Sequence, residues 1–290
     1  MKKLRSLLVL TICLTFVFIP ASCLATDRSI LQADNLVSVG FGLLRMQYGE
    51  TYSGYSDYLD TETGNILSLV GERSVLADDR GSEPQKTFFG IPLFPGGYAS
   101  LRLVYSDGST LYNGYTFSGV AISTTDLDTI LKGDLSLGRS YSPVGYLVLI
   151  PKVDLGIQNW KRVSNPNYIY GGINYESVEI YRHLSAGAGL KCDIRISEGN
   201  VLSIGFDLLQ NFNSNMTSSY DGNHYELGNN LDVRANAKLT FEVSQDVNLF
   251  GAVDYETFRY GISDVAPNGF LEPDSKTAMT LYTFGFAYYY

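Results

Sequence analysis

The hydrophobic pattern along this chain has a period of two. Between positions 177 and 197 the even positions are apolar except for Arg182, and the odd positions are polar or small. Successive side chains of a β-strand point to opposite faces, so such a run predicts a strand with one apolar and one polar face. Strands usually span about 3–10 residues. The length of this run therefore indicates a strand that crosses a membrane.

Similar runs recur along the chain and predict an all-β fold, a transmembrane antiparallel up-and-down β-barrel of ten strands. The expected strands cover 35–48, 64–76, 98–112, 127–139, 146–160, 177–197, 201–213, 225–243, 247–260 and 277–290. Asp107-Gly108 is a strong hairpin signal, and a hairpin there with an extra strand near 51–61 gives twelve strands. Because Leu103, Tyr105 and Leu111 keep one parity through it, a continuous strand and ten strands are favoured.

Short turns at 140–143, 198–200 and 244–246 alternate with long polar segments at 161–175, 213–224 and 261–276. Membrane barrels have short periplasmic turns and long extracellular loops. We therefore expect both ends of residues 26–290 on the periplasmic side and the long segments outside.

The final strand ends on alternating aromatic residues, which are Tyr282, Phe284, Phe286, Tyr288 and Tyr290. This ending resembles the C-terminal signature of bacterial outer-membrane β-barrel proteins. The resemblance implies that the residues form an assembly signal, with the barrel-assembly machinery as a partner through the C-terminal strand. It also implies lipid and lipopolysaccharide as surroundings. Arg182, which interrupts an apolar face near its outer end, is expected to meet lipopolysaccharide phosphates or to extend to the interface.

The first residues predict export. A basic start, an apolar run and small residues before Ala25 are typical of a secretory signal peptide over 1–25. Acylation of Cys23 is the alternative. We expect an exported outer-membrane protein whose mature chain keeps only Cys192.

The charge balance bears on the partners. Residues 1–25 hold three basic and no acidic residues, so removing them changes the net charge from −9 to −12. This acidity argues against nucleic acid as a partner. The chain has two histidines and no metal-binding cluster in its sequence, and we expect no cofactor.

The polar face of the strands predicts ion pairs inside a narrow lumen. If strands pair across the short turns, Lys191 is expected opposite Asp207 and Arg234 opposite Glu256. Lys238 is then expected to lie diagonal to Asp254 and to pair with it. The interpretations left open are a polar plug, a thin porin-like conduit and a binding cavity.

Two enzyme hypotheses arise from local patterns. His183-Leu184-Ser185 resembles the His-x-Ser of outer-membrane phospholipase A and the lipid A deacylase, which implies a lipid hydrolase with His as base and Ser as nucleophile. The orienting residue is missing at the family spacing, and Ala186 stands where the deacylase has Asn.

The omptin proteases resemble this chain in size, strand length and loop layout. Asp126-Leu127-Asp128 imitates their Asp pair, but the surroundings of His224 do not reproduce their Asp-His pair. We therefore expect a non-enzymatic surface or structural barrel, or a small pore for a solute or surface ligand, and keep the His183/Ser185 hydrolase as the alternative.

Overall fold

The computed structural model of the chain describes residues 27–51, 60–78, 85–115, 121–164, 169–170, 173–174, 176–267, 269 and 271–290. The expected signal peptide at 1–25, with Cys23, lies outside the described residues, and so does most of the segment 51–61.

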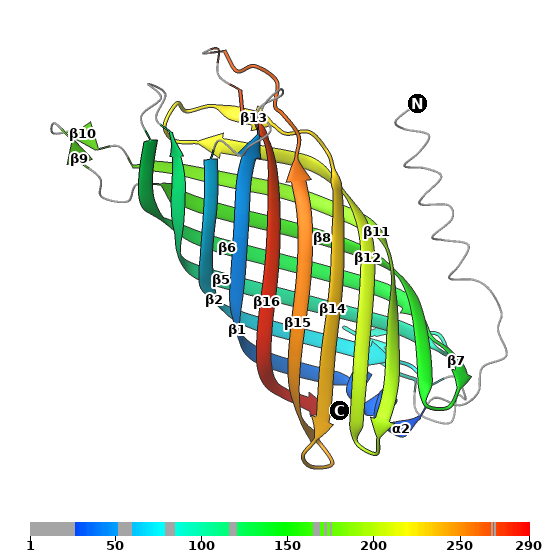
Figure 1. Ribbon diagram of the computed structural model, residues 1–290. Coiled ribbons are helices and arrows are strands. Elements are labelled where there is room, and N and C mark those ends of the chain that lie inside the picture. Colours follow the sequence, from blue (N-terminus) through cyan, green and yellow to red (C-terminus); the bar gives the residue numbers. More distant parts are fainter. Residues whose placement is uncertain are drawn as a thin grey trace, which may run out of the picture.

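Ten long strands form a closed antiparallel barrel, as the alternation predicts (Figure 1). They are β1 (Leu36–Thr51), β2 (Asp60–Leu76), β5 (Gly97–Tyr115), β6 (Ala121–Arg139), β8 (Leu147–Ser164), β11 (Ser177–Ser197), β12 (Asn200–Ser218), β14 (Leu231–Glu242), β15 (Val247–Tyr260) and β16 (Asp274–Tyr289). Each strand pairs with its neighbours in the chain, and β1 pairs with β16 from Leu36↔Tyr289 to Thr51↔Asp274. Closure removes the unpaired edges that an open sheet would leave.

β5 runs without a break through Asp107 and Gly108. Asp107 pairs with both β2 and β6, and Gly108 pairs with β6. The continuous reading and the count of ten strands are therefore confirmed. Asp107-Gly108 does not form a hairpin turn here. The side chains before and after it continue one alternation of inward and outward positions, so the strand buries the same face along its length.

Side chains on the outer wall are apolar and exposed, and those on the inner wall are mostly buried. Phe41 on β1 is 75 % exposed and Leu67 on β2 is 73 % exposed, whereas Met46 and Ile66, which point inward, are fully buried. A protein in water places apolar side chains inside. An apolar outer belt is instead the pattern of a barrel surrounded by lipid.

β12 is longer than expected and contains a bulge. The pairing of β11 with β12 shifts between Arg182 and Leu184, opposite Asn213, whose φ is 52°. An extra residue in one strand reverses which side chains face inward, so Met216 is buried inside. This reversal hides the continuation of the strand in a sequence read for strict alternation.

The strand expected at 225–243 begins later, at Leu231. Residues His224–Glu226 form the short strand β13, which pairs with β12. The period-two pattern of 225–243 would place Leu227 on the apolar outer face with Leu231 and Val233, but it is 6 % exposed in the interior cluster. The reason is that this segment folds over the end of the barrel opposite α2 rather than continuing its wall (Figure 1).

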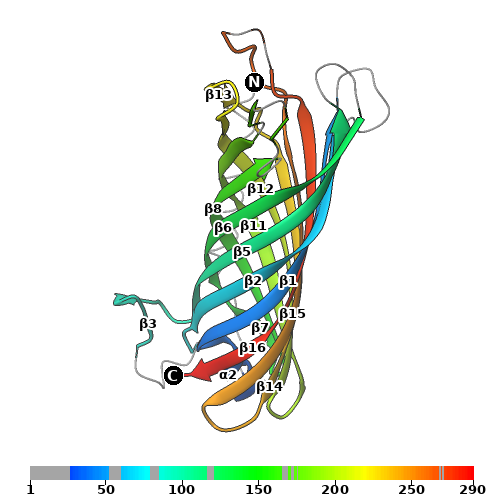
Figure 2. The same cartoon turned by 90° about the vertical axis from the view of Figure 1, so that its left-hand side faces the viewer.

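A short helix lies at the other end of the barrel, together with the C-terminus (Figures 1 and 2). This helix, α2 (Arg28–Asp34), begins at Asp27, whose side chain accepts a hydrogen bond from the Ser29 N–H. No helix in the described part of the chain has the length and apolar character needed to span a bilayer.

The remaining strands are short. β3 (Thr87–Phe88) pairs with β4 (Ile91–Pro92) between β2 and β5, and β7 (Tyr141–Val144) lies before β8. β9 (Ile169–Tyr170) pairs with β10 (Ile173–Asn174). The β3–β4 hairpin leaves the barrel at the α2 end (Figure 2).

Candidate functional site

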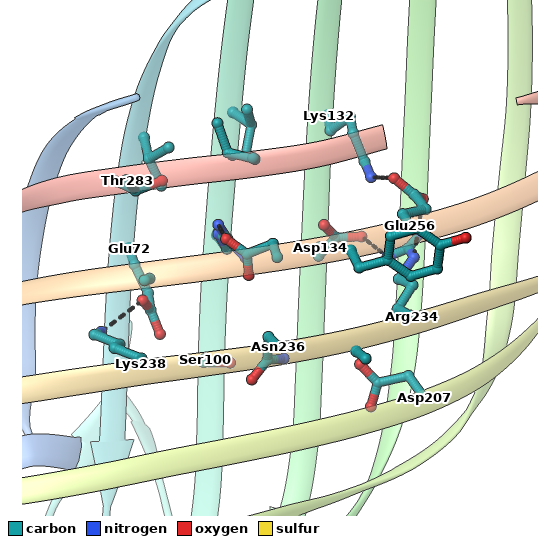
Figure 3. Close-up of a pocket in the computed structure, with 18 of the residues that line it drawn as sticks. Glu72, Ser100, Lys132, Asp134, Asp207, Arg234, Asn236, Lys238, Glu256 and Thr283 are labelled. Carbon is teal, nitrogen blue, oxygen red and sulfur yellow. Dashed lines mark hydrogen bonds and ion pairs between the residues drawn. The ribbon is translucent and has the colours of Figure 1, made fainter. Parts of the chain in front are cut away.

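A cavity of about 170 Å³ lies within the barrel interior. Its charged lining comes from eight of the ten long strands, and Figure 3 shows part of it. The basic members are Arg102, Lys132, Lys152, Lys191, Arg234 and Lys238, and the acidic members are Glu72, Asp134, Asp154, Asp207, Asp254 and Glu256. The two sets are equal in number, and the buried carboxylates of Asp34, Asp193 and Asp232 pair with cations of the same lining.

Arg234 on β14 is the centre of this lining. Its Nη1 lies 2.6 Å from Asp134 Oδ1, its Nε lies 3.0 Å from Glu256 Oε1, and its guanidinium lies 2.8 Å from Asp232 Oδ2. Lys132 forms a second ion pair with Glu256. A buried charge is tolerated when it is paired and hydrogen-bonded, and the fork of the guanidinium suits several carboxylates at once.

Other pairs cross the lumen between strands that are not neighbours. Arg102 donates two hydrogen bonds of 2.6 Å to Asp254, and Lys238 Nζ lies 2.9 Å from Glu72. The lumen is therefore narrow enough for charged side chains to span it, as expected for a barrel of this size.

The structure contains the expected pair between Arg234 and Glu256, which are directly opposed. The expected opposition of Lys191 and Asp207 is wrong. The turn after β11 is tighter than assumed and the register shifts between Arg195 and Ser197, so Lys191 lies opposite Gly205. Asp207 instead lies 2.6 Å from Lys152 Nζ.

Lys238 lies opposite Ala252, which places Asp254 on the diagonal as expected. The ion pair expected between them is nevertheless wrong, because each has a partner across the lumen. Lys238 pairs with Glu72, and Asp254 pairs with Arg102. Pairing across a narrow lumen cannot be inferred from the hairpin register alone.

An apolar layer lies on the outer side of the cavity. It is one buried cluster with members from nine of the ten long strands and from the segments between β12 and β14 and after β15. Trp160 stacks on Tyr181 with ring centroids 5.1 Å apart, and Tyr181 stacks on Tyr260 at 5.6 Å. Interiors pack about as densely as organic crystals, and the members of this layer are buried against one another.

Beyond this layer, Arg162 on β8 joins carboxylates from several elements. Its guanidinium lies 2.5 Å from Glu179 and 3.3 Å from Glu62. Tyr181 Oη, which accepts a hydrogen bond from Arg162, donates to Glu272 Oε1 at 2.8 Å. This contact attaches Glu272, in the segment after β15, to the residues around Arg162. Burial raises the pKa of Glu272 well above its usual range, and nearby Glu50 and Glu179 raise it further.

Helix α2 covers the opposite end of the lumen. Ile30 and Leu31 pack in a buried cluster with residues of β2, β5, β8 and β12, namely Leu76, Tyr98, Val148, Ile150 and Val201. Lys191 Nζ lies 2.6 Å from Asp34 Oδ1, and Arg195 Nη1 lies 2.6 Å from Asp27 Oδ2. The cavity thus lies between a helix plug and an aromatic layer.

Comparison with known proteins gives structural similarity only. The chain matches no protein-family model and no curated protein. Its fold is similar to that of the outer membrane protease OmpT from Escherichia coli, with a TM-score of 0.59 and 9% sequence identity over 93% of this chain and 99% of that one. The β-domain of the Bordetella autotransporter BrkA matches with a TM-score of 0.43 and 11% identity, over 88% of this chain and 100% of that chain. This chain has the fold of a bacterial outer-membrane β-barrel.

The barrel places His183 and Ser185 on its inner wall, 2 % and 1 % exposed. His183 Nδ1 is hydrogen-bonded to Tyr260 Oη at 2.8 Å, and its ring lies against Phe258 with centroids 5.3 Å apart. Ser185 Oγ accepts a hydrogen bond of 3.4 Å from Arg234. Both side chains therefore point away from the apolar outer wall.

The Asp126–Asp128 pair is also directed inward, and both residues are buried. Trp160 Nε1 donates to Asp128 Oδ1 at 2.6 Å, and Ser164 Oγ donates to Asp126 Oδ2 at 2.9 Å. His224 is an exposed residue of β13. Across the described ranges, no group of three or more His, Cys, Asp and Glu residues has the arrangement of a metal site.

The C-terminal aromatic residues of the barrel point outward. Their exposed fractions lie between 38 % and 60 %, for Tyr282, Phe284, Phe286, Tyr288 and Tyr290. Arg182 is exposed on the lipid-facing side of β11, near the end of the strand that begins at Ser177. The thiol of Cys192 is free. The inward and outward faces of the last strand follow the alternation of the sequence.

Three parts of the lumen were not inferred from the sequence. These are the α2 plug, the aromatic layer and the Arg162 group. The Asp at position 27 before an apolar stretch is an N-cap signal for α2. Trp160 and Tyr181 lie an even number of positions from buried polar residues of the same strand. The alternation of the sequence therefore places both side chains on the inner face. Which inward side chains meet across the lumen depends on the tilt of the strands.

Proposed function

We propose that this chain is an integral β-barrel of the bacterial outer membrane that displays its outer segments at the cell surface and does not conduct solutes. In this proposal α2, the short turns and the C-terminus lie in the periplasm, and β13 lies outside. The apolar outer wall and the outward C-terminal aromatics support the membrane location. Lipopolysaccharide phosphates are the partner proposed for Arg182, and the assembly machinery is the partner proposed for the last strand.

The observation that carries the proposal is the filling of the lumen between its two ends. Along the barrel axis the described side chains form the α2 plug, the ion-paired lining and the aromatic layer. A conduit for an ion would need a continuous polar path. The ion-paired lining and the apolar layers on both sides of it favour a structural role for the lumen.

The experiment is conductance in planar bilayers, with the purified barrel incorporated from proteoliposomes. Flotation of the vesicles first verifies that the protein is in the bilayer, and a general porin serves as the conducting control. We expect a flat current trace for this protein at all applied voltages. Stable unitary current steps would overturn the proposal and favour the narrow pore.

Surface display is tested separately with an epitope tag. A tag inserted at Asp221, in the turn between β12 and β13, is expected to bind antibody on intact cells. A matched tag at Gly199, in the turn between β11 and β12, is expected to bind only after permeabilisation. The reverse result would contradict the proposed orientation.

A further inference from the structure

The connection between β2 and β5 is long, although it lies at the end with the short turns. Its β3–β4 hairpin packs on the outer surface of the barrel wall. Val75 and Ala99 point outward by parity, yet both are fully buried because Phe88 of the hairpin packs on them. Leu101 and Leu135 of the outer wall also pack against this cluster. The hairpin is thus continuous with the apolar belt of the barrel.

The hairpin and the residues just after β4 expose large apolar side chains. Phe89, Ile91 and Phe94 are 57 %, 67 % and 49 % exposed. Phe89 has a φ of 49° and Gly90 a φ of 80°. Asn or Asp is the usual residue at the first position of such a turn, and a bulky residue with positive φ is uncommon. Phe89 packs edge-on against Phe88, with ring centroids 4.7 Å apart, and still leaves more than half of its surface exposed.

Basic side chains lie beside the hairpin and the C-terminal residues. The Arg73 guanidinium lies 4.6 Å from the ring centroid of Phe89 and 5.3 Å from that of Tyr290. Arg139 lies 5.8 Å from the centroid of Phe94. Lys86 Nζ lies 3.4 Å from the Tyr290 backbone oxygen. Arg73 and Arg139 point outward at the α2 ends of β2 and β6.

We propose that the β3–β4 hairpin is an interfacial anchor that binds phospholipid in the periplasmic leaflet of the outer membrane. Phe89, Ile91 and Phe94 enter the acyl region, and the surrounding basic side chains bind headgroup phosphates. This inference rests on the membrane location proposed above. Its chemistry is that of interfacial anchors, in which aromatic side chains lie at the headgroup level and basic side chains attract anionic lipids.

Two features favour lipid over a periplasmic protein as the occupant. Phe88 of the hairpin packs on the outer wall, where its apolar cluster continues into Leu101 and Leu135 of the lipid-facing belt. The basic residues form a rim beside the aromatic tip, which matches the order of acyl chains and phosphates across a leaflet. A protein partner would not need this continuity with the belt.

The test uses tryptophan quenching by phospholipids brominated at shallow or deep acyl positions. The chain has one tryptophan, Trp160, which is fully buried inside the barrel and so gives an unquenched baseline. Phe89→Trp and, independently, Phe94→Trp add a reporter to the hairpin. Phe41→Trp in the belt is the positive control, and Glu198→Trp in the turn after β11 is the negative control.

We expect the hairpin reporters to lose most of their added emission, more with shallow than with deep bromines. The anchor would be overturned if aqueous iodide quenches the hairpin reporters and the brominated lipids do not. If the bromines still quench Phe41→Trp in that case, the membrane barrel stands. Failure of bromines to quench Phe41→Trp would overturn the membrane location itself.

The headgroup contact has its own variant. In the Phe89→Trp background, Lys86→Gln is expected to lower the preference of quenching for anionic over zwitterionic brominated phospholipid about fivefold. An unchanged preference would overturn the role of this side chain in phosphate binding. Phe41→Trp with and without Lys86→Gln controls for changes in lipid distribution around the whole barrel.

Discussion

Lys191 Nζ lies 2.6 Å from Asp34 Oδ1, and this ion pair joins the wall of the barrel to helix α2. Lys191 also lies 2.5 Å from Asp193 on the same strand. One ammonium group therefore pairs with two buried carboxylates, one on the plug and one on the wall. The contact fixes the plug in the lumen in addition to the apolar packing of Ile30 and Leu31.

Replacing Lys191 by Met is expected to destabilise the barrel by about 3–5 kcal/mol, because two buried carboxylates lose their cation. Asp34→Asn is the matched control. It retains a hydrogen-bonding group and leaves the Lys191–Asp193 pair, so we expect a loss of about 1 kcal/mol. The measurement is denaturant unfolding in detergent, followed by gel mobility without boiling. Equal losses for the two variants would contradict the role assigned to Lys191.

Arg234 is expected to be the most sensitive position of the lumen lining. Arg234→Met leaves Asp134 and Asp232 without this cation, at a cost of about 3–5 kcal/mol. Arg234→Lys keeps the charge but loses the fork that contacts three carboxylates, so a smaller loss is expected. Unfolding of both variants is compared with the wild type by the same gel assay. A stable Met variant would argue against a structural role for the lining.

Ser185→Ala is expected to leave phospholipid and lipid A hydrolysis by purified barrel at the background of an empty-vector preparation. The reason is that His183 is hydrogen-bonded to Tyr260 and both side chains point into the filled lumen, away from acyl chains. Product release is measured by mass spectrometry for wild type and variant. Hydrolysis by the wild type that disappears in Ser185→Ala would reinstate the hydrolase.

The attachment of Glu272, in the segment after β15, is expected to depend on pH. Burial raises the pKa of Glu272 in the folded state, and the nearby Glu50 and Glu179 add to this effect against the opposing Arg162. The protonated form therefore favours the attached segment, so attachment is fully stabilised below the unfolded pKa and is lost as pH rises through the raised pKa. Protease cleavage of the segment should rise with pH, by up to about tenfold per unit.

Glu272→Gln is the control for this prediction, because the amide mimics the protonated carboxyl and does not titrate. Its cleavage rate should be independent of pH after correction for the protease itself. A wild type with the same flat profile would contradict the assignment.

The C-terminal aromatics are expected to govern assembly. Phe286 is 59 % exposed on the outer wall of β16. Phe286→Asp places a charge against lipid, at a cost that depends on depth and reaches a few kcal/mol. We expect less heat-modifiable barrel in outer-membrane fractions of cells, whereas Phe286→Leu should assemble normally. Equal amounts of the two variants would contradict the role proposed for this strand.

The wall of the barrel could be predicted from the sequence because lipid on one side and a filled lumen on the other impose strict alternation. β11 and β15 begin and end at the residues expected from the pattern, Ser177–Ser197 and Val247–Tyr260. The pattern fails where the chain leaves this environment. The bulge at Asn213 changes parity, and Leu227 is buried under a folded-over segment.

The interior could be predicted only along hairpins. Arg234 and Glu256 are opposed across a short turn, so their pairing follows from counting residues. Arg102 and Asp254 lie on strands far apart in the chain and meet because the barrel is narrow. Such pairs depend on strand tilt and side-chain length, which one sequence does not specify. The β3–β4 hairpin and α2 have no strand periodicity to reveal them.

The most direct test of a filled barrel surrounded by lipid is the accessibility of spin labels on β11 and β12 to oxygen and to a water-soluble nickel complex. Cys192 is first replaced by Ser, and single labels are placed at outward Ile204, Phe206 and Leu208 and at inward Ser185 and Ser203. We predict high oxygen accessibility at the outward positions and low accessibility to both reagents at the inward positions. Nickel access at the inward positions would indicate an open aqueous lumen, and nickel access at the outward positions would contradict the membrane barrel.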